Sequence, residues 1–324
     1  MKQRSLVAGV LLTIFLAPVL LPTSATAQAP TYLTQWGTDG SGPGQFARPI
    51  ALAVDAISNV YVVDYLNHRI QVFTPDGTFL RQWGGQGSGV GQFSYPVGIA
   101  IDGSGLVYVA EQGNRRIQVF TSEGVPVRQW GSYGTEPGQF YDPWDVAVGA
   151  DGTVFVVEDR NHRVQAFAAD TTFLRQWSVA PYPSMPRNLA IGPDGRLFVV
   201  EPNADQVSVY MPDSTLVARW GSCCGGPGQF NGPMGVALDR AGNVYVADYG
   251  NCRIDVFTAA GGYLAEWGGR GSGPGQFSGP SDVVVDDAGH VYVMDSLNNR
   301  VQVFGQVPSP ALPSSWGRLK SLYR

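Results

Sequence analysis

Short apolar runs rich in Val, Ile, Tyr and Phe recur along most of the chain and are separated by glycine-rich turns. One stretch, residues 96–130, reads PVGIAID, LVYVAE, RRIQVF and VPVRQW from run to run. Runs of four to eight residues with this composition, bounded by Gly, Asp and Ser, are typical of β-strands. The pattern therefore predicts four short strands in each repeated unit and no long helix.

Two series of aromatic residues mark six copies of this unit. One series ends a strand in each copy: Phe73, Phe120, Phe167, Tyr210, Phe257 and Phe304. The other consists of tryptophans: Trp36, Trp83, Trp130, Trp177, Trp220 and Trp267. Neighbours within each series are 47 residues apart, except for one interval of 43. Four strands in about 40–50 residues correspond to one blade of a β-propeller, so the chain is predicted to be all-β with six blades.

The two series are out of phase, which predicts how the ring closes. Trp36 precedes the first complete set of strands, and the pattern stops at Phe304 before a fourth strand. The segment 32–36 is therefore expected to add the missing strand to the sixth blade, so that residues 28–304 form one closed, four-stranded-blade ring. Such pairing also covers an exposed sheet edge.

Segments such as PVGIAIDGSGLVYVAEQGNRRIQVF and PMGVALDRAGNVYVADYGNCRIDVF resemble the NHL repeat. The resemblance covers residues 31–304 and implies a six-bladed propeller, and the recurring GPGQF segments between units resemble bacterial extracellular members. NHL proteins include ligand-binding sensor domains, RNA-binding domains and a peptide-amidating lyase, so the family does not select one activity. That lyase holds zinc through histidines, whereas the three histidines here, His68, His162 and His290, are predicted to lie too far apart to share a metal.

Positions that recur in every unit are interpreted as structural. An acid ends the second strand in six units: Asp64, Glu111, Glu158, Glu201, Asp248 and Asp295. An arginine opens the third strand in five: Arg69, Arg116, Arg163, Arg253 and Arg300. These residues flank a tight turn, so each pair is expected to form a clasp across it. The Phe of GPGQF is expected to fill the gap between blades.

Positions that differ among the six copies are the candidates for binding. The two residues after each inner-strand proline vary and are expected to face the channel and the upper face, defined here as the face with the interblade crossings. Trp144, Asp145, Arg187, Asn188, Met234 and Asp282 are of this kind. Glu201 is added because Gln206 replaces its arginine, with Arg187 as a possible substitute partner. Aromatic, charged and amide groups that converge on a concave mouth are a default ligand site.

The N-terminal sequence predicts export. Lys2 and Arg4, an apolar stretch and the sequence Ala25-Thr26-Ala27 are typical of a cleaved signal peptide at residues 1–27. The alternative is an uncleaved membrane anchor; after cleavage no transmembrane segment is expected. The predicted location is secreted, periplasmic or associated with the cell envelope. Residues 305–324 read as a Pro-rich linker and a short basic tail.

Composition and charge narrow the partners. The chain has 42 glycines, 23 prolines and only 15% charged residues, as six sets of tight turns require. Its net charge of −5 becomes about −10 for residues 28–304. Phosphate backbones need a basic surface, so nucleic acid is not expected as a partner.

Cofactors and disulfides are predicted from few residues. No cofactor is expected, although Asp145 and Asp282 could share a calcium ion. Cys252 and the neighbours Cys223 and Cys224 are assigned to loops on one face of the fifth blade. In an exported chain this favours a disulfide between Cys252 and one of the other two.

These observations favour an exported, non-catalytic propeller that binds a protein, small-molecule or glycan ligand through its upper face and central channel. Two alternatives remain open. One is a propeller enzyme of the lyase or hydrolase type, acting through Asp145, Asp282 or Glu201. The other is a structural envelope module attached through its C-terminal tail.

Overall fold

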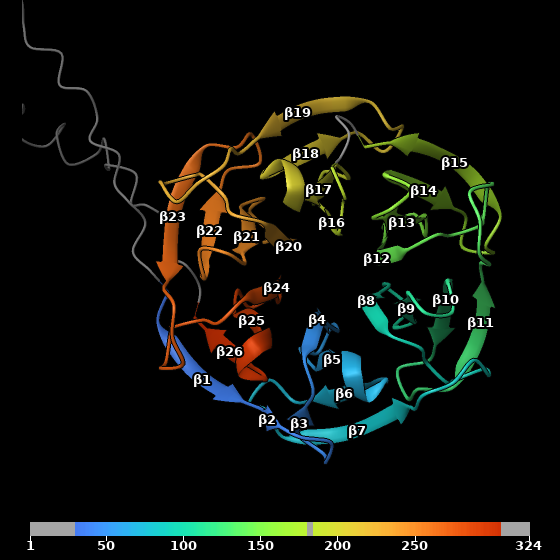
Figure 1. Cartoon of the computed structure of the whole chain (residues 1–324), viewed down its shortest axis with the longest axis horizontal. Helices are drawn as coiled ribbons and strands as arrows, with labels where there is room; N and C mark the ends of the chain where they lie inside the picture. The colour runs from blue at the N-terminus through green and yellow to red at the C-terminus, as the bar shows by residue number, and fades with distance from the viewer. Residues whose placement is uncertain (1–29, 180–183, 306–324) are drawn as a thin grey trace, which may run out of the picture. The chain divides into compact units, whose positions relative to one another are not determined.

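A computed structural model describes residues 30–179 and 184–305. The predicted signal peptide and the predicted tail from residue 306 onwards lie outside these residues. The described residues form six four-stranded sheets arranged around a central channel (Figure 1). The predicted six-bladed, all-β propeller is therefore confirmed.

Each of the first three blades consists of four consecutive antiparallel strands. Blade 1 contains β4 (Pro49–Val54), β5 (Val60–Asp64), β6 (Arg69–Phe73) and β7 (Phe79–Gly84). Blade 2 contains β8 (Pro96–Ile101), β9 (Val107–Glu111), β10 (Arg116–Phe120) and β11 (Pro126–Trp130). Blade 3 contains β12 (Pro143–Val148), β13 (Val154–Glu158), β14 (Arg163–Phe167) and β15 (Phe173–Ser178).

The next three blades repeat this order, with an exception in the last. Blade 4 contains β16 (Asn188–Ile191), β17 (Leu197–Glu201), β18 (Gln206–Tyr210) and β19 (Leu216–Trp220). Blade 5 contains β20 (Pro233–Leu238), β21 (Val244–Asp248), β22 (Arg253–Phe257) and β23 (Tyr263–Gly268). Blade 6 contains β24 (Pro280–Val285), β25 (Val291–Asp295), β26 (Arg300–Phe304) and β1 (Tyr32–Trp36).

Strand β1 closes the ring as predicted. It pairs antiparallel with β26, with Tyr32 opposite Phe304 and Trp36 opposite Val301. The Tyr32 and Phe304 rings meet edge to face, with centroids 6.0 Å apart. Strands from the two ends of the ring thus form one sheet, and Figure 1 shows β1 beside β26.

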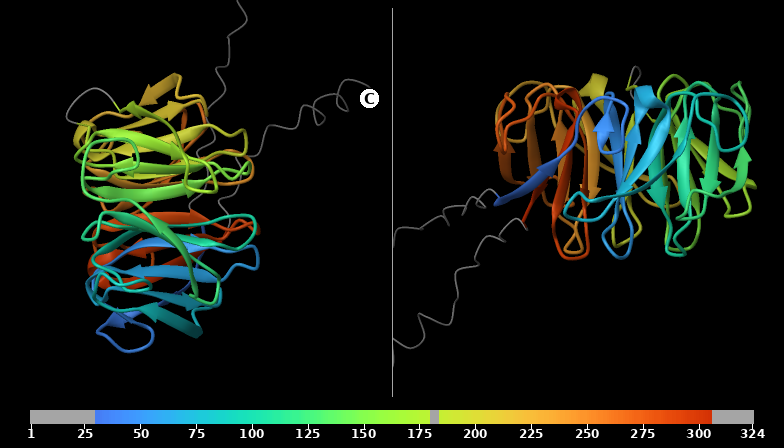
Figure 2. Two further views of the ribbon diagram at one scale, coloured as in Figure 1. Left: turned by 90° about the vertical axis from the view of Figure 1, so that its right-hand side faces the viewer. Right: turned by 90° about the horizontal axis from the view of Figure 1, so that it is seen from below.

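The remaining elements are short and lie in the connections. Thr38–Asp39 (β2) pairs in parallel with Gln45–Phe46 (β3) in the first crossing between blades. Three single-turn 3₁₀ helices follow second strands: η1 (Tyr65–Asn67), η2 (Pro202–Ala204) and η3 (Ser296–Asn298). Figure 2 shows the ring edge-on, with the strands running between its two faces. No helix among the described residues is long and apolar enough to cross a bilayer.

The repeated acid and arginine form the predicted clasp in five blades, and the clasp is buried. In blade 1, Arg69 Nε donates to Asp64 Oδ2 at 2.8 Å, and the Asp64 side chain is fully buried. The other two nitrogens of Arg69 donate to the carbonyl oxygens of Ser41, Gly42 and Gln45 in the crossing. The clasp therefore holds the crossing against its blade as well as bridging the turn.

Aromatic residues fill the spaces between blades. The crossing phenylalanines predicted to plug these gaps are fully buried: Phe46, Phe93, Phe140, Phe230 and Phe277. The strand-ending tryptophan of one blade covers a turn of the next. A Cβ on Gly77, which has φ of +89°, would lie 2.6 Å from the Trp36 ring, so only glycine fits beneath that indole.

Candidate functional site

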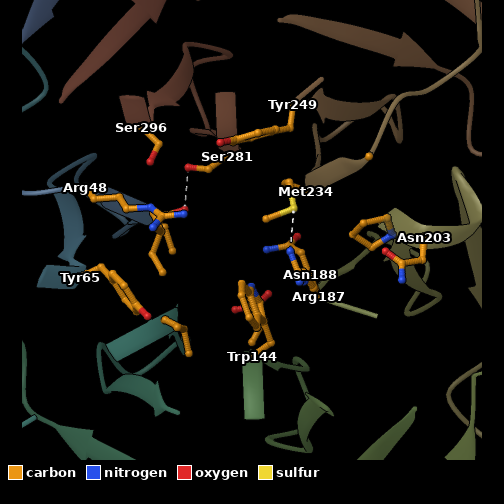
Figure 3. Close-up of a pocket in the computed structure, with 16 residues that line it drawn as sticks. Arg48, Tyr65, Trp144, Arg187, Asn188, Asn203, Met234, Tyr249, Ser281 and Ser296 are labelled. Atoms are coloured by element: carbon orange, nitrogen blue, oxygen red, sulfur yellow. Dashed lines mark hydrogen bonds between the residues drawn. The ribbon is translucent and has the colours of Figure 1, made fainter. Parts of the chain in front are cut away.

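A cavity of about 360 Å³ opens on the upper face at the mouth of the channel. All six residues that follow the inner-strand prolines line it: Ile50, Val97, Trp144, Arg187, Met234 and Ser281. Figure 3 shows Trp144, Arg187 and Met234 close together, with Arg48 and Tyr65 on the opposite side.

A backbone irregularity directs these side chains into the cavity. In blade 3, Pro143 pairs with Glu158 and Asp145 with Val157, so Trp144 is an extra residue in the inner strand. The same register shift follows the inner-strand proline in blades 1, 2, 5 and 6. A bulge of this kind re-aims one side chain. The sequence varies at the position that the bulge presents to the cavity.

Arg187 is held from three sides. Its guanidinium lies 4.3 Å from the centroid of the Trp144 ring, a cation–π distance. Its Nε pairs with Asp159 Oδ2 at 3.0 Å, and its Nη1 lies 3.6 Å from Met234 Sδ. The predicted pairing of Arg187 with Glu201 is therefore wrong, because the turn of blade 3 supplies the acid.

Glu201 lies away from the cavity. Its side chain is fully buried inside blade 4, where it accepts hydrogen bonds from Gln206 Nε2 at 3.0 Å and from Ser208 Oγ. Burial raises the pKa of this carboxyl group. The neighbouring residues Pro202 and Asn203 line the cavity in its place.

Asp145, Asn188 and Asp282 connect adjacent blades along the channel. Each accepts a hydrogen bond from a backbone N–H of the next inner strand: Leu189 N to Asp145 Oδ2 at 3.1 Å, Val236 N to Asn188 Oδ1 at 2.8 Å and Leu52 N to Asp282 Oδ2 at 2.8 Å. Inner strands are sheet edges, and a buried edge N–H needs an acceptor. These three side chains therefore have a structural role.

Burial dominates the electrostatics of the two carboxyl groups. It raises the pKa of Asp145 well above its usual range, with a smaller contribution from Asp282, and raises the pKa of Asp282 to about 7. Asp282 does not line the upper cavity; it lies with Asp145 and Asn188 along a second space of about 310 Å³ in the lower channel. The described residues contain no group of three or more His, Cys, Asp or Glu side chains placed to hold a metal.

Several lining residues escaped the sequence analysis, which compared only the positions after the prolines. Tyr65, Pro202, Tyr249 and Ser296 directly follow the acid that ends each second strand. That position also varies from copy to copy, so the same internal comparison would have found it. The other missed residues are Asn203 and the residues before the prolines of blades 1 and 5, Arg48 and Gly232.

Arg48 brings a positive charge to the wall of the cavity. Its side chain is exposed at the cavity, while its backbone N–H donates to Asn299 Oδ1 at 2.8 Å. Within residues 30–179 and 184–305, no ion pair includes Arg48. Burial raises the pKa of the nearby Tyr65 phenol, and Arg48 partly offsets that rise.

The predicted disulfide of Cys252 is absent, since all three cysteines are free thiols. Cys252 is buried, and its Sγ lies 3.7 Å from the Tyr249 carbonyl oxygen within its own turn. Cys223 and Cys224 are exposed, with their sulfur atoms 2.9 Å apart. Placement of both loops on one face was not sufficient, because the Cys252 side chain turns into the blade.

Comparison with known proteins identifies the repeat. The NHL repeat matches residues 93–120, 140–167, 230–257 and 277–304. A 43-residue stretch is 46% identical to Protein wech of Drosophila melanogaster; it represents 13% of this chain and 5% of that protein.

Solved structures share the architecture at low sequence identity. A Bacteroides thetaiotaomicron protein of unknown function has a TM-score of 0.65 at 17% identity, covering 84% of this chain and 76% of that one. A gluconolactonase from Xanthomonas campestris has a TM-score of 0.61 at 16% identity (86% and 98% covered). A streptogramin B lyase has a TM-score of 0.60 at 14% identity (88% and 94% covered). These likenesses concern the fold alone.

Proposed function

We propose that this NHL-repeat β-propeller is an exported, non-catalytic binding protein that takes a small anionic molecule or glycan into the mouth of its channel. The ligand would place a carboxylate against Arg48. It would place a flat carbon face against the aromatic side chains that line the cavity, Tyr65, Trp144 and Tyr249. A cavity of about 360 Å³ is of the size that small-molecule sites commonly have.

The unpaired Arg48 is the observation that carries this proposal. Of the three charged residues that line the cavity, Arg187 is paired with Asp159 and Asp145 is buried with a raised pKa. Arg48 is left as the cation without a counterion, in a body whose net charge is about −10. A guanidinium can bind a carboxylate through two parallel hydrogen bonds.

The walls of the cavity favour a ligand with a flat face. Trp144, Tyr65 and Tyr249 line it together with Ser281, Ser296 and Asn203. Aromatic rings supply contact area at low cost in side-chain entropy, while hydroxyl and amide groups orient polar substituents. A uronic acid or an aromatic carboxylate combines the two features.

The binding role is placed ahead of the enzymatic alternative because the candidate catalytic acids are already engaged. Asp145 and Asp282 accept backbone hydrogen bonds from neighbouring blades, and Glu201 is buried inside blade 4. The envelope-module alternative depends on the tail, which lies outside the described residues. Export itself is testable, since the mature protein is expected to begin at Gln28.

Titration calorimetry with matched probe pairs tests the ligand class. We expect glucuronate to bind more tightly than glucose, and indole-3-acetate more tightly than indole-3-acetamide, by about tenfold, which corresponds to one charge-assisted hydrogen-bonded contact. The two pairs distinguish a sugar face from an aromatic face.

Variants connect the preference to the cavity. Arg48→Met should abolish the difference within each pair without changing the melting temperature. Arg240→Met is the matched control, because Arg240 is an exposed arginine paired with Asp287 and does not line the cavity. Equal binding of charged and neutral probes to the wild-type protein, or a preference that survives in Arg48→Met, would reject the proposal.

A further inference from the structure

The crossing into blade 5 differs from the other crossings at one backbone position. Four crossings have a glycine there: Gly40, Gly87, Gly134 and Gly271. The crossing into blade 5 has Cys224, with φ of +116°. Its N–H still donates to the Phe230 carbonyl oxygen at 2.8 Å, as the N–H of Gly40 donates to that of Phe46 at 3.0 Å. Cys224 therefore keeps the backbone hydrogen bond of the glycine that it replaces, although its φ differs from the +144° of Gly40.

That backbone is unfavourable for a residue with a side chain. The φ of Cys224, +116°, lies in a region that residues with a Cβ rarely adopt. A non-glycine residue with such a φ is a local strain that often accompanies a specific role of its side chain. The four other crossings of this type have glycine at this position, so the thiol of Cys224 needs a separate explanation.

The two neighbouring thiols face each other in solvent. Cys223 Sγ and Cys224 Sγ are 2.9 Å apart and both residues are exposed, whereas Cys252 is 2% exposed and turned toward Tyr249. The Cys224 thiol raises the pKa of Cys223 to about 11.

The blade-5 crossing is also held less firmly than its counterparts. In blade 1, Gln71 accepts from Gly44 N at 2.9 Å and donates to Gln45 O at 2.7 Å, which fastens the crossing to the third strand. Asp255 occupies that position in blade 5 and pairs with Arg253 at 3.0 Å; its Oδ1 is buried without a hydrogen-bond partner. Among the described residues, Asp255 accepts a hydrogen bond from Arg253 Nε and makes none to the crossing.

We propose that Cys223 and Cys224 form a reversible vicinal disulfide that fixes the local backbone conformation of this crossing. The oxidant is a disulfide, either a small molecule or a protein of the thiol–disulfide exchange class. The Cys224 thiolate attacks one sulfur of the oxidant, forming a mixed disulfide and expelling one thiolate. Cys223 then loses its proton and attacks Cys224 Sγ, forming the internal S–S bond and expelling the second thiolate. Two protein thiols are oxidised and one disulfide is reduced to two thiols.

Adjacency makes this bond easy to reverse. Consecutive Cα atoms lie about 3.8 Å apart, closer than the roughly 4.4–6.8 Å that unstrained disulfides span. Strained, exposed disulfides are reduced more readily than buried structural ones. The pair is therefore expected to respond to the redox poise of its surroundings.

Thiol counting on the whole protein tests the proposal. The purified protein is incubated with oxidised glutathione, the small thiols are removed, and the denatured chain is alkylated and weighed. We expect one alkylated cysteine, Cys252, after oxidation, and three after treatment with a reductant. Cys252→Ala should give none and two, and before alkylation its oxidised form should be about 2 Da lighter than its reduced form, equal to two hydrogens.

Peptide mapping distinguishes the outcomes. A linkage that contains Cys252, a stable glutathione adduct on either neighbour, a disulfide-linked dimer or three free thiols after oxidation would each overturn the proposal. A mapped bond between Cys223 and Cys224, retained in Cys252→Ala and lost in Cys223→Ser, would establish it.

Discussion

Blades 1 and 5 have the same strand arrangement but differ in the number of acids that surround the arginine of the clasp. In blade 1, Arg69 faces one acid, Asp64, and the neutral Gln71 completes the contacts to the crossing. In blade 5, Arg253 is shared by Asp248 at 3.5 Å, Asp255 at 3.0 Å and Glu266 at 2.9 Å. Burial raises the pKa of Asp255 to about 8, although Arg253 opposes that rise.

The difference shows how much buried charge one repeat tolerates. A desolvated arginine can compensate one carboxylate well, but a second buried acid beside it remains costly and tends to hold its proton. The amide of glutamine gives the same shape with both a donor and an acceptor. Removing the arginine of blade 1 should therefore lower the free energy of unfolding, whereas removing the extra acid of blade 5 should raise it.

Removing the blade-1 arginine should have the largest effect. Arg69→Met leaves Asp64 buried without its cation and releases the crossing carbonyls of Ser41, Gly42 and Gln45. We expect a loss of about 3–5 kcal/mol in the free energy of unfolding, measured by urea denaturation. Arg240→Met removes an exposed pair and should cost less than about 1 kcal/mol. Equal effects of the two substitutions would mean that burial does not strengthen the clasp.

Converting blade 5 to the blade-1 pattern should have the next largest effect, with the opposite sign. Asp255→Gln restores the donor to the crossing and removes the extra acid, so we expect a gain of about 1–3 kcal/mol at pH 8. A carboxyl with a raised folded-state pKa binds more protons folded than unfolded between its two pKa values. Stability therefore falls as pH rises from about 4 to about 8.

The same measurement across pH provides the control. The advantage of Asp255→Gln over the wild type should shrink toward pH 4, where the carboxyl of the unfolded chain is also protonated. A gain that is constant between pH 4 and pH 8 would show that the hydrogen bonds, and not the charge, make the difference.

Restoring glycine in the blade-5 crossing should have a smaller effect. Cys224→Gly removes a side chain from a backbone with φ of +116°, a strain of roughly 1 kcal/mol or more. The melting temperature of the reduced protein should rise by about 2 °C, as read by calorimetry under reductant. Cys223→Gly, in the neighbouring position, is the comparison variant and should not raise it. A lower melting temperature for Cys224→Gly would mean that contacts of the cysteine side chain stabilise the folded protein.

The smallest effect is expected in the channel, where blades 4 and 6 have an amide and an acid at equivalent positions. Asp282→Asn keeps an acceptor for Leu52 N, as Asn188 does for Val236 N. We expect a gain of about 1 kcal/mol or less at pH 8, because the lost charge is offset by the loss of the second acceptor used by Val283 N. Stability of the wild type should fall between about pH 4 and the raised pKa of about 7, and this slope should weaken in the variant. A large loss instead would show that both carboxylate oxygens are needed.

The frame of the ring was predictable because it recurs. Six equivalent acids and the phase of Trp36 against Phe304 were sufficient to assign the clasps and the closing strand. The burial of Asp64 was not predictable in the same way, since it depends on how the crossing that precedes blade 1 folds back over it.

Side-chain direction was the main quantity that the sequence did not supply. Cys252 lies in the expected loop, but with φ of +56° its thiol points into the blade and not toward Cys223. Arg187 lies at the expected mouth, yet its acid is Asp159, a turn residue whose approach depends on the curvature of two blades. Arg48 and Tyr65 belong to positions that vary among the copies but were not compared.

Because β1 pairs with β26, the ring can close only after the last strand has been synthesised. The closing strand ends at Trp36, and its partner ends at Phe304. At about 5–20 residues per second, β1 leaves the ribosome tens of seconds before β26 is complete. Throughout that interval it is an unpaired strand whose open edge can pair with other chains. Folding therefore requires that β1 stays unpaired with other chains until β26 is complete. The finished ring, in which β1 is paired, no longer shows this requirement.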